Sequence, residues 1–223
     1  MSNRLTAAIT KFEVVKPGII PYTTAIVLQE SYAKAILDGT GPEALILLEH
    51  PHVITLGRGF HQENLLISPE LLAERGVTVE ETGRGGDVTY HGPGQVVGYP
   101  ILNISNKPDL HLYLRNLEEL MIRCVADFGV HADRKPGMTG IWVEDEKIGA
   151  IGVRVVRWIT SHGFALNVNT DLKYFDYIVP CGIKQFGVTS LQKLLGHEIP
   201  IQEVHESLIR NFESIFNRRV ERG

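Results

Sequence analysis

The order of amphipathic segments along the chain is the feature that most limits its fold. Apolar residues recur at helical spacing in three segments and predict three helices, each with one buried face, at Thr23–Asp38, Leu110–Phe128 and Ile201–Phe216. Short runs with the composition of strands lie between them, at residues 44–50, 77–82, 95–102, 139–156, 161–168 and 186–191. These strands do not alternate regularly with helices. We therefore expect a mixed, largely antiparallel sheet with helices packed on it, an α/β fold of the α+β kind.

The domain organisation follows from the length of the chain and from the lack of an internal linker. A chain of 223 residues is long enough to bury one core. No Ser/Pro-rich stretch and no run of charge divides it, so we expect a single domain over residues 1–223. A polar turn at Glu144–Lys147 interrupts the strand-like run at 139–156 and predicts a hairpin there.

Charge and hydropathy exclude several classes of protein. The formal net charge is −4, which argues against a general nucleic-acid binder, because such proteins carry a surplus of basic residues. The first residues form no long apolar run, and no stretch reaches the roughly 18 apolar residues of a membrane span. We therefore expect a cytoplasmic protein that binds neither nucleic acid nor membrane and keeps its cysteines reduced.

The stretch RGGDVTYHGPGQ, at Arg84–Gln95, contains too much glycine for an ordinary strand or helix. It matches neither the P-loop pattern nor a GxGxxG motif that opens a helix, so it does not indicate a nucleotide site. One interpretation is a glycine-rich turn that precedes the next strand. The other is a backbone that approaches a ligand closely, with Arg84 and His91 holding a polar or anionic group. The local sequence leaves both open.

The two cysteines of the chain lie in different contexts. Cys124 falls on the apolar stripe of the second predicted helix, where a cysteine acts as a small core side chain. Cys181 lies between a proline and a glycine, at a turn, and is either a buried structural residue or a nucleophile. A nucleophilic thiol needs an activator. Lys147, at the junction of the polar turn and an apolar run, is either that activator or a solvated hairpin lysine. The absence of a CxxC pair argues against a cysteine-based zinc site.

Several of these segments together resemble the lipoyl(octanoyl) transferase family. The block RGGDVTYHGPGQVVGYPI is similar to that family's glycine-rich motif, and LLEHPHVITLGRG, the central block 139–172 and IVPCGI…GVTSL are similar to its other motifs. The matches follow the family order from Leu45 to Leu191. Two departures are small: Gly149 stands where alanine is commoner, and HPHVIT varies the usual second proline.

The resemblance implies a fold, an activity and partners. The fold would be the one shared by lipoate and biotin protein ligases. The activity would be transfer of an octanoyl group from octanoyl-acyl carrier protein to a lysine of lipoyl domains, in lipoate biosynthesis. The acceptors would be the lipoyl domains of 2-oxoacid dehydrogenase complexes and the glycine cleavage H protein. Because the donor is already a thioester, we expect neither ATP, nor a metal, nor another cofactor to be needed.

The resemblance also implies roles for individual residues. Cys181 would form the acyl-thioester, and Lys147 would lower the pKa of that cysteine or accept its proton. The acyl pocket would be lined by three segments of the chain: Arg84, Gly85, Gly86, Asp87, Val88, Thr89, Tyr90 and His91; Ala150, Ile151 and Gly152; Gly163, Phe164 and Ala165.

Three alternatives remain beside this interpretation. An ATP-dependent lipoate–protein ligase would share the fold but would activate a free acid and need no cysteine. An amidotransferase acting between carrier domains would use a cysteine placed differently from the PCGI loop. A non-catalytic module would bind lipoyl domains or acyl carrier protein without forming an acyl-enzyme.

Overall fold

The computed structural model describes residues 10–179 and 186–221, and its largest element is a mixed β-sheet. Eight of its described strands lie in the order β12-β1-β2-β6-β10-β9-β8-β7, and the short β11 pairs with β9. The pairs β1–β2, β1–β12 and β9–β11 are parallel, and the other pairs are antiparallel. The predicted mixed, largely antiparallel sheet is therefore confirmed. Its strands are β1 (Thr10–Ile19), β2 (Glu43–Glu49), β6 (Gln95–Ile101), β7 (Asp133–Lys135), β8 (Met138–Val143), β9 (Glu146–Val156), β10 (Ile159–Asn167), β11 (Gly187–Val188) and β12 (Arg218–Val220).

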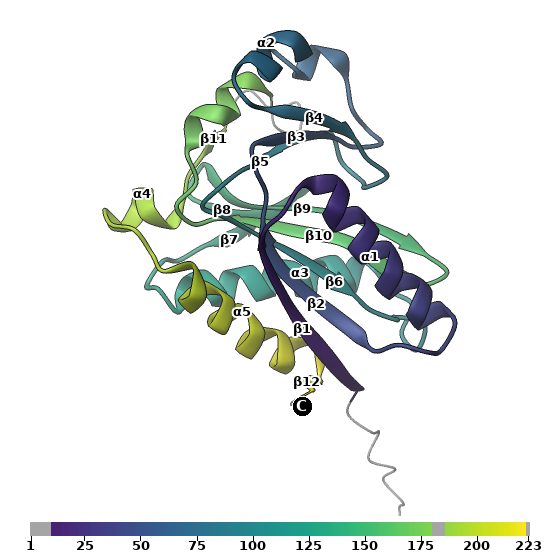
Figure 1. The fold of residues 1–223 in the computed structure, drawn as a ribbon. Helices are drawn as coiled ribbons and strands as arrows, with labels where there is room; N and C mark the ends of the chain where they lie inside the picture. The colour runs from purple at the N-terminus through teal and green to yellow at the C-terminus, as the bar shows by residue number, and fades with distance from the viewer. Residues whose placement is uncertain (1–9, 180–185, 222–223) are drawn as a thin grey trace, which may run out of the picture.

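Helices cover both faces of this main sheet, and α1 (Tyr22–Leu37) lies on the face opposite α3 (Leu110–Ala126) and α5 (Ile201–Phe216) (Figure 1). The side chains of β2 alternate between the two faces of the sheet, which explains why both faces need a covering helix. Leu45 and Leu47 belong to the core beneath α3 and α5, whereas Ala44, Ile46 and Leu48 belong to the core beneath α1. Successive side chains of a strand point to opposite faces, so an almost wholly apolar strand is buried on both sides.

The three predicted helices are present, with small shifts at their ends. The first begins at Tyr22 rather than Thr23, the second ends at Ala126 rather than Phe128, and the third has the predicted bounds. Two short helices were not predicted, α2 (Pro69–Glu74) and α4 (Leu191–Leu195). Helices of five or six residues are too short to show a helical period. Ser68 and Ser190 cap them by accepting hydrogen bonds from backbone N–H groups, which is the local signal that marks their starts.

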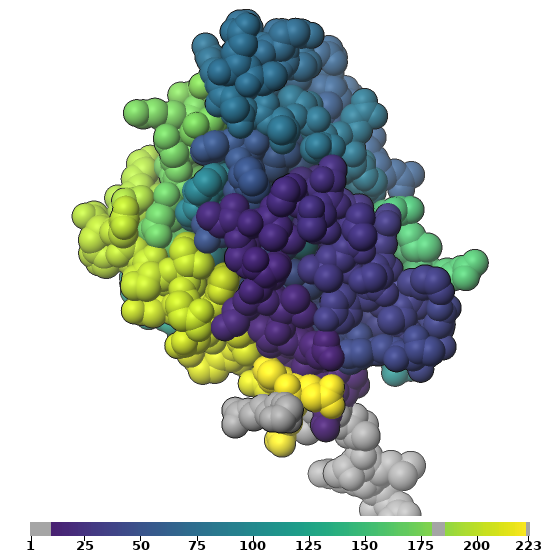
Figure 2. Space-filling model, viewed as in Figure 1, coloured from purple at the N-terminus to yellow at the C-terminus, as the bar shows by residue number. Residues whose placement is uncertain are grey.

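A second, three-stranded sheet stands above the main sheet in Figure 1, and the space-filling view shows its blue atoms stacked over the purple atoms of the N-terminal segment (Figure 2). Its order is β4 (Thr78–Glu81), β3 (Val53–Leu56) and β5 (Val88–His91). This sheet has a hydrophobic core of its own, to which η2 (Leu172–Tyr177) contributes Phe175. The short η1 (Gln62–Asn64) lies in the loop that follows β3. Strand β5 corrects the expectation that the glycine-rich stretch holds no strand, because its four non-glycine residues Val88–His91 pair with β3.

Two boundaries in the second half of the chain also differ from expectation. The hairpin turn between β8 and β9 is confined to Glu144 and Asp145, so Lys147 belongs to strand β9 and not to the turn. In the segment 186–191, which was expected to be a strand, only Gly187 and Val188 pair with β9, and Leu191 begins α4.

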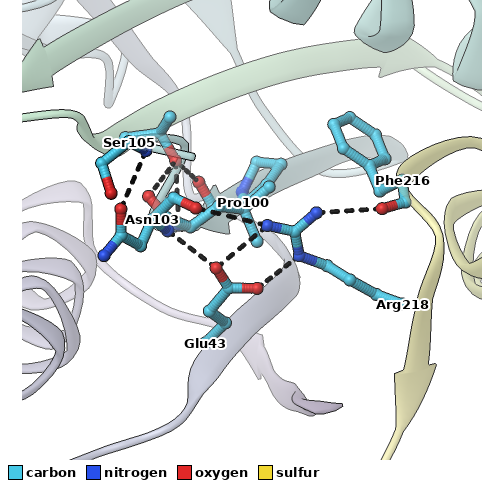
Figure 3. A network of polar contacts seen from close by, with 8 residues as sticks. Glu43, Pro100, Asn103, Ser105, Phe216 and Arg218 are labelled. Carbon is cyan, nitrogen blue, oxygen red and sulfur yellow. Dashed lines mark hydrogen bonds and ion pairs between the residues drawn. The ribbon is translucent and has the colours of Figure 1, made fainter. Parts of the chain in front are cut away.

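A buried ion pair fastens the C-terminal strand to the sheet, as Figure 3 shows. The guanidinium of Arg218 forms a two-pronged contact with the carboxylate of Glu43, at the start of β2, and one of its nitrogens lies 3.0 Å from Oε1. Glu43 Oε1 also accepts a hydrogen bond from the backbone N–H of Asn103 (2.8 Å), and Arg218 donates to the carbonyl of Phe216 (2.9 Å). The pair thus joins β12, β2 and the end of β6.

Removing one partner of this pair is expected to destabilise the fold strongly. In Arg218→Ala the carboxylate of Glu43 stays buried without its counter-charge, so we expect a loss of about 3–5 kcal/mol in the free energy of unfolding, measured by chemical denaturation. Lys11→Ala is the matched control, because its ion pair with Glu221 also ties the C-terminal end of the described chain to the sheet, through β1, but is exposed, and we expect it to cost about 0–1 kcal/mol. If both variants lost the same free energy of unfolding, burial would not explain the strength of the Arg218–Glu43 pair.

Candidate active site

A cavity of about 480 Å³ lies between the main sheet, the first turn of α1 and the glycine-rich loop that precedes β5. Three segments that are far apart in the sequence meet at its wall. Thirteen of the fourteen residues expected to line a pocket do so, namely Arg84–Thr89, His91, Ala150–Gly152 and Gly163–Ala165. Lys147 also lines it. Tyr90 does not, because its ring is buried in the core of the small sheet and its hydroxyl contacts His52 (2.7 Å).

Small residues on two adjacent strands make room for this cavity. In the pairing of β9 with β10, Ala150 lies opposite Ala165 and Gly152 lies opposite Gly163. A Cβ atom on Gly152 would lie 2.9 Å from Cδ of Arg84 and 3.0 Å from the carbonyl oxygen of Gly85. The glycine at 152 thus allows the loop to approach the strand closely, and the two alanines fill little of the hollow beside it.

Arg84 shapes the loop that closes the cavity. Its Nη2 donates to the carbonyl oxygen (2.7 Å) and hydroxyl (2.9 Å) of Thr55 on β3, and its Nη1 donates to the carbonyl of Gly85 (3.0 Å). The backbone N–H of Gly85 in turn donates to the carbonyl of Val153 on β9 (2.9 Å). Arg84 therefore holds its own loop against both sheets, a role that the sequence analysis did not assign to it.

Asp87 links the same loop to the segment that leads toward residue 180. One carboxylate oxygen accepts from the backbone N–H of Val88 (2.8 Å), and the other accepts from the side-chain amide of Asn64 (2.6 Å). The carbonyl of Asn64 then accepts from the backbone N–H of Val179 (2.8 Å). Residues 180–185, and with them Cys181, lie outside the described residues. Val179 and Phe186 are the described residues on either side of that segment.

A chain of buried amides runs from the cavity to the neighbourhood of Lys147. His91 Nδ1 lies 2.7 Å from Gln95 Oε1, Gln95 Nε2 donates to Asn167 Oδ1 (2.9 Å), and Asn167 Nδ2 donates to the carbonyl of Thr189 (2.9 Å). Because the amide oxygen of Gln95 can only accept, His91 carries its proton on Nδ1 and leaves Nε2 as an acceptor. The backbone N–H of Thr189 donates to the carbonyl of Lys147 (3.0 Å).

Three buried histidines near the inner end of the cavity are held neutral. Burial lowers the pKa of His50 to about 4, and burial with the nearby His50 lowers that of His91 to about 3. Burial, followed by the charges of Arg84 and Arg154, lowers the pKa of His162 to about 4. Burial raises the pKa of the Tyr22 phenol to about 12. The rings of Tyr22, His91 and His162, which line the cavity, are therefore polar but uncharged, and Arg84 lines it as well.

Lys147 enters the cavity from the second residue of β9. Its side chain is buried, with 9% of the residue exposed, and its ammonium lies 5.0 Å from the ring centroid of Trp142 on β8, a cation–π contact. Its strand partner in β11 is Val188, and the Phe186 ring lies 5.4 Å from that of Trp142. The lysine is thus not a solvated hairpin residue, and Val188 of β11 lies beside it.

Two residues that the sequence analysis missed shape the space for Lys147. Gly140 has φ +118°, and a Cβ there would lie 2.9 Å from Cε of Lys147 and 2.5 Å from the carbonyl oxygen of Gly149. The backbone N–H of Gly140 donates to the buried carboxylate of Glu118 on α3 (3.1 Å). That carboxylate also binds Arg115 (2.6 Å) and Arg134 (3.0 Å). The sequence signal that could have identified Glu118 is its place on the apolar stripe of a predicted helix, because a glutamate is seldom buried unless it has a partner.

The other cysteine, Cys124, is fully buried in the core beneath α3, as the helical pattern indicated. Burial raises the pKa of its thiol to about 12, so it stays protonated at neutral pH. In the described part of the chain, no group of three or more His, Cys, Asp or Glu side chains is placed to hold a metal ion. No described helix is long and apolar enough to span a membrane.

Comparison with known families and proteins gives a consistent result. Residues 21–213 match the model of the lipoyl protein ligase A/B catalytic domain. The chain is 52% identical over 201 residues to an octanoyltransferase of Solibacter usitatus, with 90% of each chain covered. It is 47% identical over 204 residues to an octanoyltransferase of Geobacter metallireducens, with 91% of this chain and 92% of that one covered.

Solved structures with the same fold are more distant in sequence. A bipartite lipoate protein ligase of Thermoplasma acidophilum is 17% identical, with a TM-score of 0.72 over 96% of this chain and 87% of that chain. A biotin protein ligase of Aquifex aeolicus is 13% identical, with a TM-score of 0.57 over 93% of this chain and 70% of that chain. The expected ligase-like fold is therefore confirmed.

Proposed function

The chain belongs to the lipoyl protein ligase A/B catalytic-domain family and, within it, to the octanoyltransferases, and we infer from this that it transfers octanoyl groups in lipoate biosynthesis. One observation in the structure supports this activity most directly. The glycine-rich loop, the small residues of β9 and β10 and the buried Lys147 all line one cavity, and Val188 from the far side of the Cys181 segment lines it too.

The reaction that we propose has two acyl transfers. The thiolate of Cys181 attacks the carbonyl carbon of the octanoyl thioester on acyl carrier protein, a new thioester forms, and the carrier thiolate leaves and takes up a proton. The amine of an acceptor lysine then attacks the Cys181 thioester, loses a proton and forms an amide, and the Cys181 thiolate leaves. The first step exchanges one thioester for another, and the second makes the more stable amide. The two acyl transfers together therefore require no ATP.

The cavity supplies the environment for this chemistry. Its alkyl-binding surface comes from the small residues Ala150, Gly152 and Ala165, while the side chains of Ile151 and Phe164 pack against the core beneath α3 and support this wall. Each methylene group buried there contributes about 0.8 kcal/mol. The buried amide chain that includes Gln95 and Asn167 fixes the walls, so that the acyl group meets a preformed site.

We assign Lys147 the role of activating Cys181. An ammonium close to a thiol favours the thiolate, and a neutral amine could accept the thiol proton. The support is positional: Phe186 and Val188, which follow the Cys181 segment, lie beside Trp142 and Lys147. Gly140 and Glu118 are positioning residues in this scheme, because Gly140 leaves room for the lysine side chain and Glu118 holds the backbone of Gly140.

The partners that we propose follow from the family. The donor is octanoyl-acyl carrier protein, and the acceptors are the lipoyl domains of 2-oxoacid dehydrogenase complexes and the glycine cleavage H protein. Among proteins of the same fold, the T. acidophilum ligase was studied with its E2 lipoyl domain. We place the reaction in the cytosol, where thiols are kept reduced.

Transfer is expected to need neither nucleotide nor metal. The measurement is the mass of an apo lipoyl domain after incubation with the enzyme and octanoyl-carrier protein, where one octanoyl group should be added. Addition of EDTA and removal of nucleotide by desalting should leave the rate unchanged, since the donor is already activated.

The control reaction supplies free octanoate and ATP in place of the carrier thioester. A lipoyl domain that gains an octanoyl group only in that reaction would move the chain to the ATP-dependent ligases. Neither reaction giving a product, with binding of the carrier retained, would favour a non-catalytic module.

A further inference from the structure

A second cavity, of about 450 Å³, lies on the α1 face of the sheet beyond the inner end of the first. It lies between α1 and the β9–β10 hairpin and is open to solvent at Leu37 and Val156. Its wall includes an apolar strip formed by Ile26, Ala33 and Leu37 of α1 and by Val156 and Ile159 of the hairpin. It therefore offers an apolar surface against which an alkyl chain could lie.

Two side chains separate the second cavity from the first. Tyr22 and His162 are the described residues that line both cavities. The Tyr22 hydroxyl lies 3.4 Å from Nδ1 of His162, and each residue is only 6% exposed. The two rings thus touch across the boundary, and the pair is called the partition below.

The backbone holds His162 in an unusual conformation. Its φ is +55°, in the left-handed region that is costly for a residue with a side chain, although it lies within strand β10. Its backbone N–H donates to the side-chain oxygen of Gln29 on α1 (2.7 Å), and Gln29 is itself buried. A strained conformation persists only where its surroundings determine it, and here it aims the imidazole at the hydroxyl of Tyr22.

The position of the partition matches the expected end of an octanoyl chain. His162 pairs with Val153 on β9, six residues along the strand from Lys147, which corresponds to about 20 Å. An extended eight-carbon chain spans about 9 Å, given C–C bonds of about 1.5 Å. The remaining distance is taken up by the thioester and the side chain of Lys147 at one end and by the two rings at the other. An acyl chain that starts beside Lys147 and follows β9 thus points its tail at the partition.

We propose that Tyr22 and His162 form the closed end of the acyl cavity and set the length of the acyl chain that the enzyme accepts. This inference rests on the octanoyltransferase activity proposed above. A chain longer than eight carbons would have to displace two buried rings, one of which is fixed by its backbone. Without the partition, the extra methylene groups would enter the second cavity and gain the apolar contacts of α1 and the hairpin.

The test compares acyl-enzyme formation with carrier proteins that bear 8-, 10-, 12- and 14-carbon chains, in competition, by intact mass of the enzyme. His162→Gly removes one ring and also suits the positive φ, so it should fold well. We expect the ratio of 12-carbon to 8-carbon adduct to rise at least about tenfold, because each newly buried methylene is worth roughly fourfold. Tyr22→Ala, which opens the other half of the partition, should shift the ratio in the same direction.

Two further variants test whether a change in chain-length preference comes from the partition or from a general loosening of the fold. Arg157 also has a positive φ (+51°) and lines the second cavity, but it does not belong to the partition, so Arg157→Gly should leave the chain-length profile unchanged. Ala33→Phe places a ring in the second cavity. Alone it should not alter the 8-carbon adduct, and combined with His162→Gly it should remove the gain for the 12-carbon chain.

The outcomes distinguish this inference from the function on which it rests. A wild-type enzyme that forms no 8-carbon adduct would refute the proposed transferase activity itself. If wild type, His162→Gly and Tyr22→Ala all form the 8-carbon adduct with the same chain-length profile, the activity stands and the partition does not set chain length. A 12-carbon gain that survives Ala33→Phe would show that longer chains leave the acyl cavity by another route.

Discussion

Replacement of Cys181 by alanine is expected to abolish both the octanoyl adduct and transfer to a lipoyl domain. The variant has no thiol in the PCGI segment, and removing a nucleophile of this kind lowers turnover by about 10⁴-fold or more. Cys124 cannot take over, because burial raises the pKa of its thiol to about 12 and leaves almost no thiolate at neutral pH. The measurement is the intact mass of the enzyme after exposure to octanoyl-carrier protein, together with the initial rate of transfer.

Cys124→Ser is the matched control, since it removes the other thiol. It should retain the adduct and the transfer rate, and it should lose about 1–3 kcal/mol of stability, because a hydroxyl replaces a thiol in an apolar core. An octanoyl adduct that persists in Cys181→Ala would exclude the assignment of the nucleophile, and peptide mapping would then locate the acylated residue.

Replacement of Lys147 by alanine is expected to slow transfer by about 10²–10⁴-fold, the range of a general acid–base group. It should also raise the pH at which Cys181 becomes reactive, because a nearby ammonium favours the thiolate. The measurement is the rate of alkylation by iodoacetamide against pH, in a Cys124→Ser background. Lys147→Arg keeps the charge but cannot accept a proton. If arginine restores the alkylation profile but not amine transfer, the lysine also acts as a base.

Neighbouring lysines provide the controls for this experiment. Lys193 lies close in space to Lys147, but its ammonium binds Glu146 at 2.6 Å and is half exposed, so Lys193→Ala should change neither profile. Lys135 is the informative competitor, because its ammonium lies 4.5 Å from the ring centroid of Phe186 and also faces Trp142. An alkylation profile that shifts in Lys135→Ala and not in Lys147→Ala would transfer the activating role to Lys135.

Secondary structure that depends on near neighbours could be predicted from the sequence. The stripes of α3 and α5 and the β8–β9 hairpin all arise from patterns within about 20 residues. The short α2 and α4 and the strands β1 and β5 could not be predicted in this way. Strand β5 forms only because β3 pairs with it, which is a contact between segments more than 30 residues apart.

The sequence by itself determined the family, the fold class and the residue types of the candidate site, because motifs and periodicity are written in local order. Only the tertiary structure decided which residues meet. It placed Tyr90 in another core, turned Arg84 toward Thr55, and brought Tyr22 against His162 from segments 140 residues apart. The physical reason is that strand register and helix packing decide which distant residues meet, and these depend on contacts that no local pattern contains.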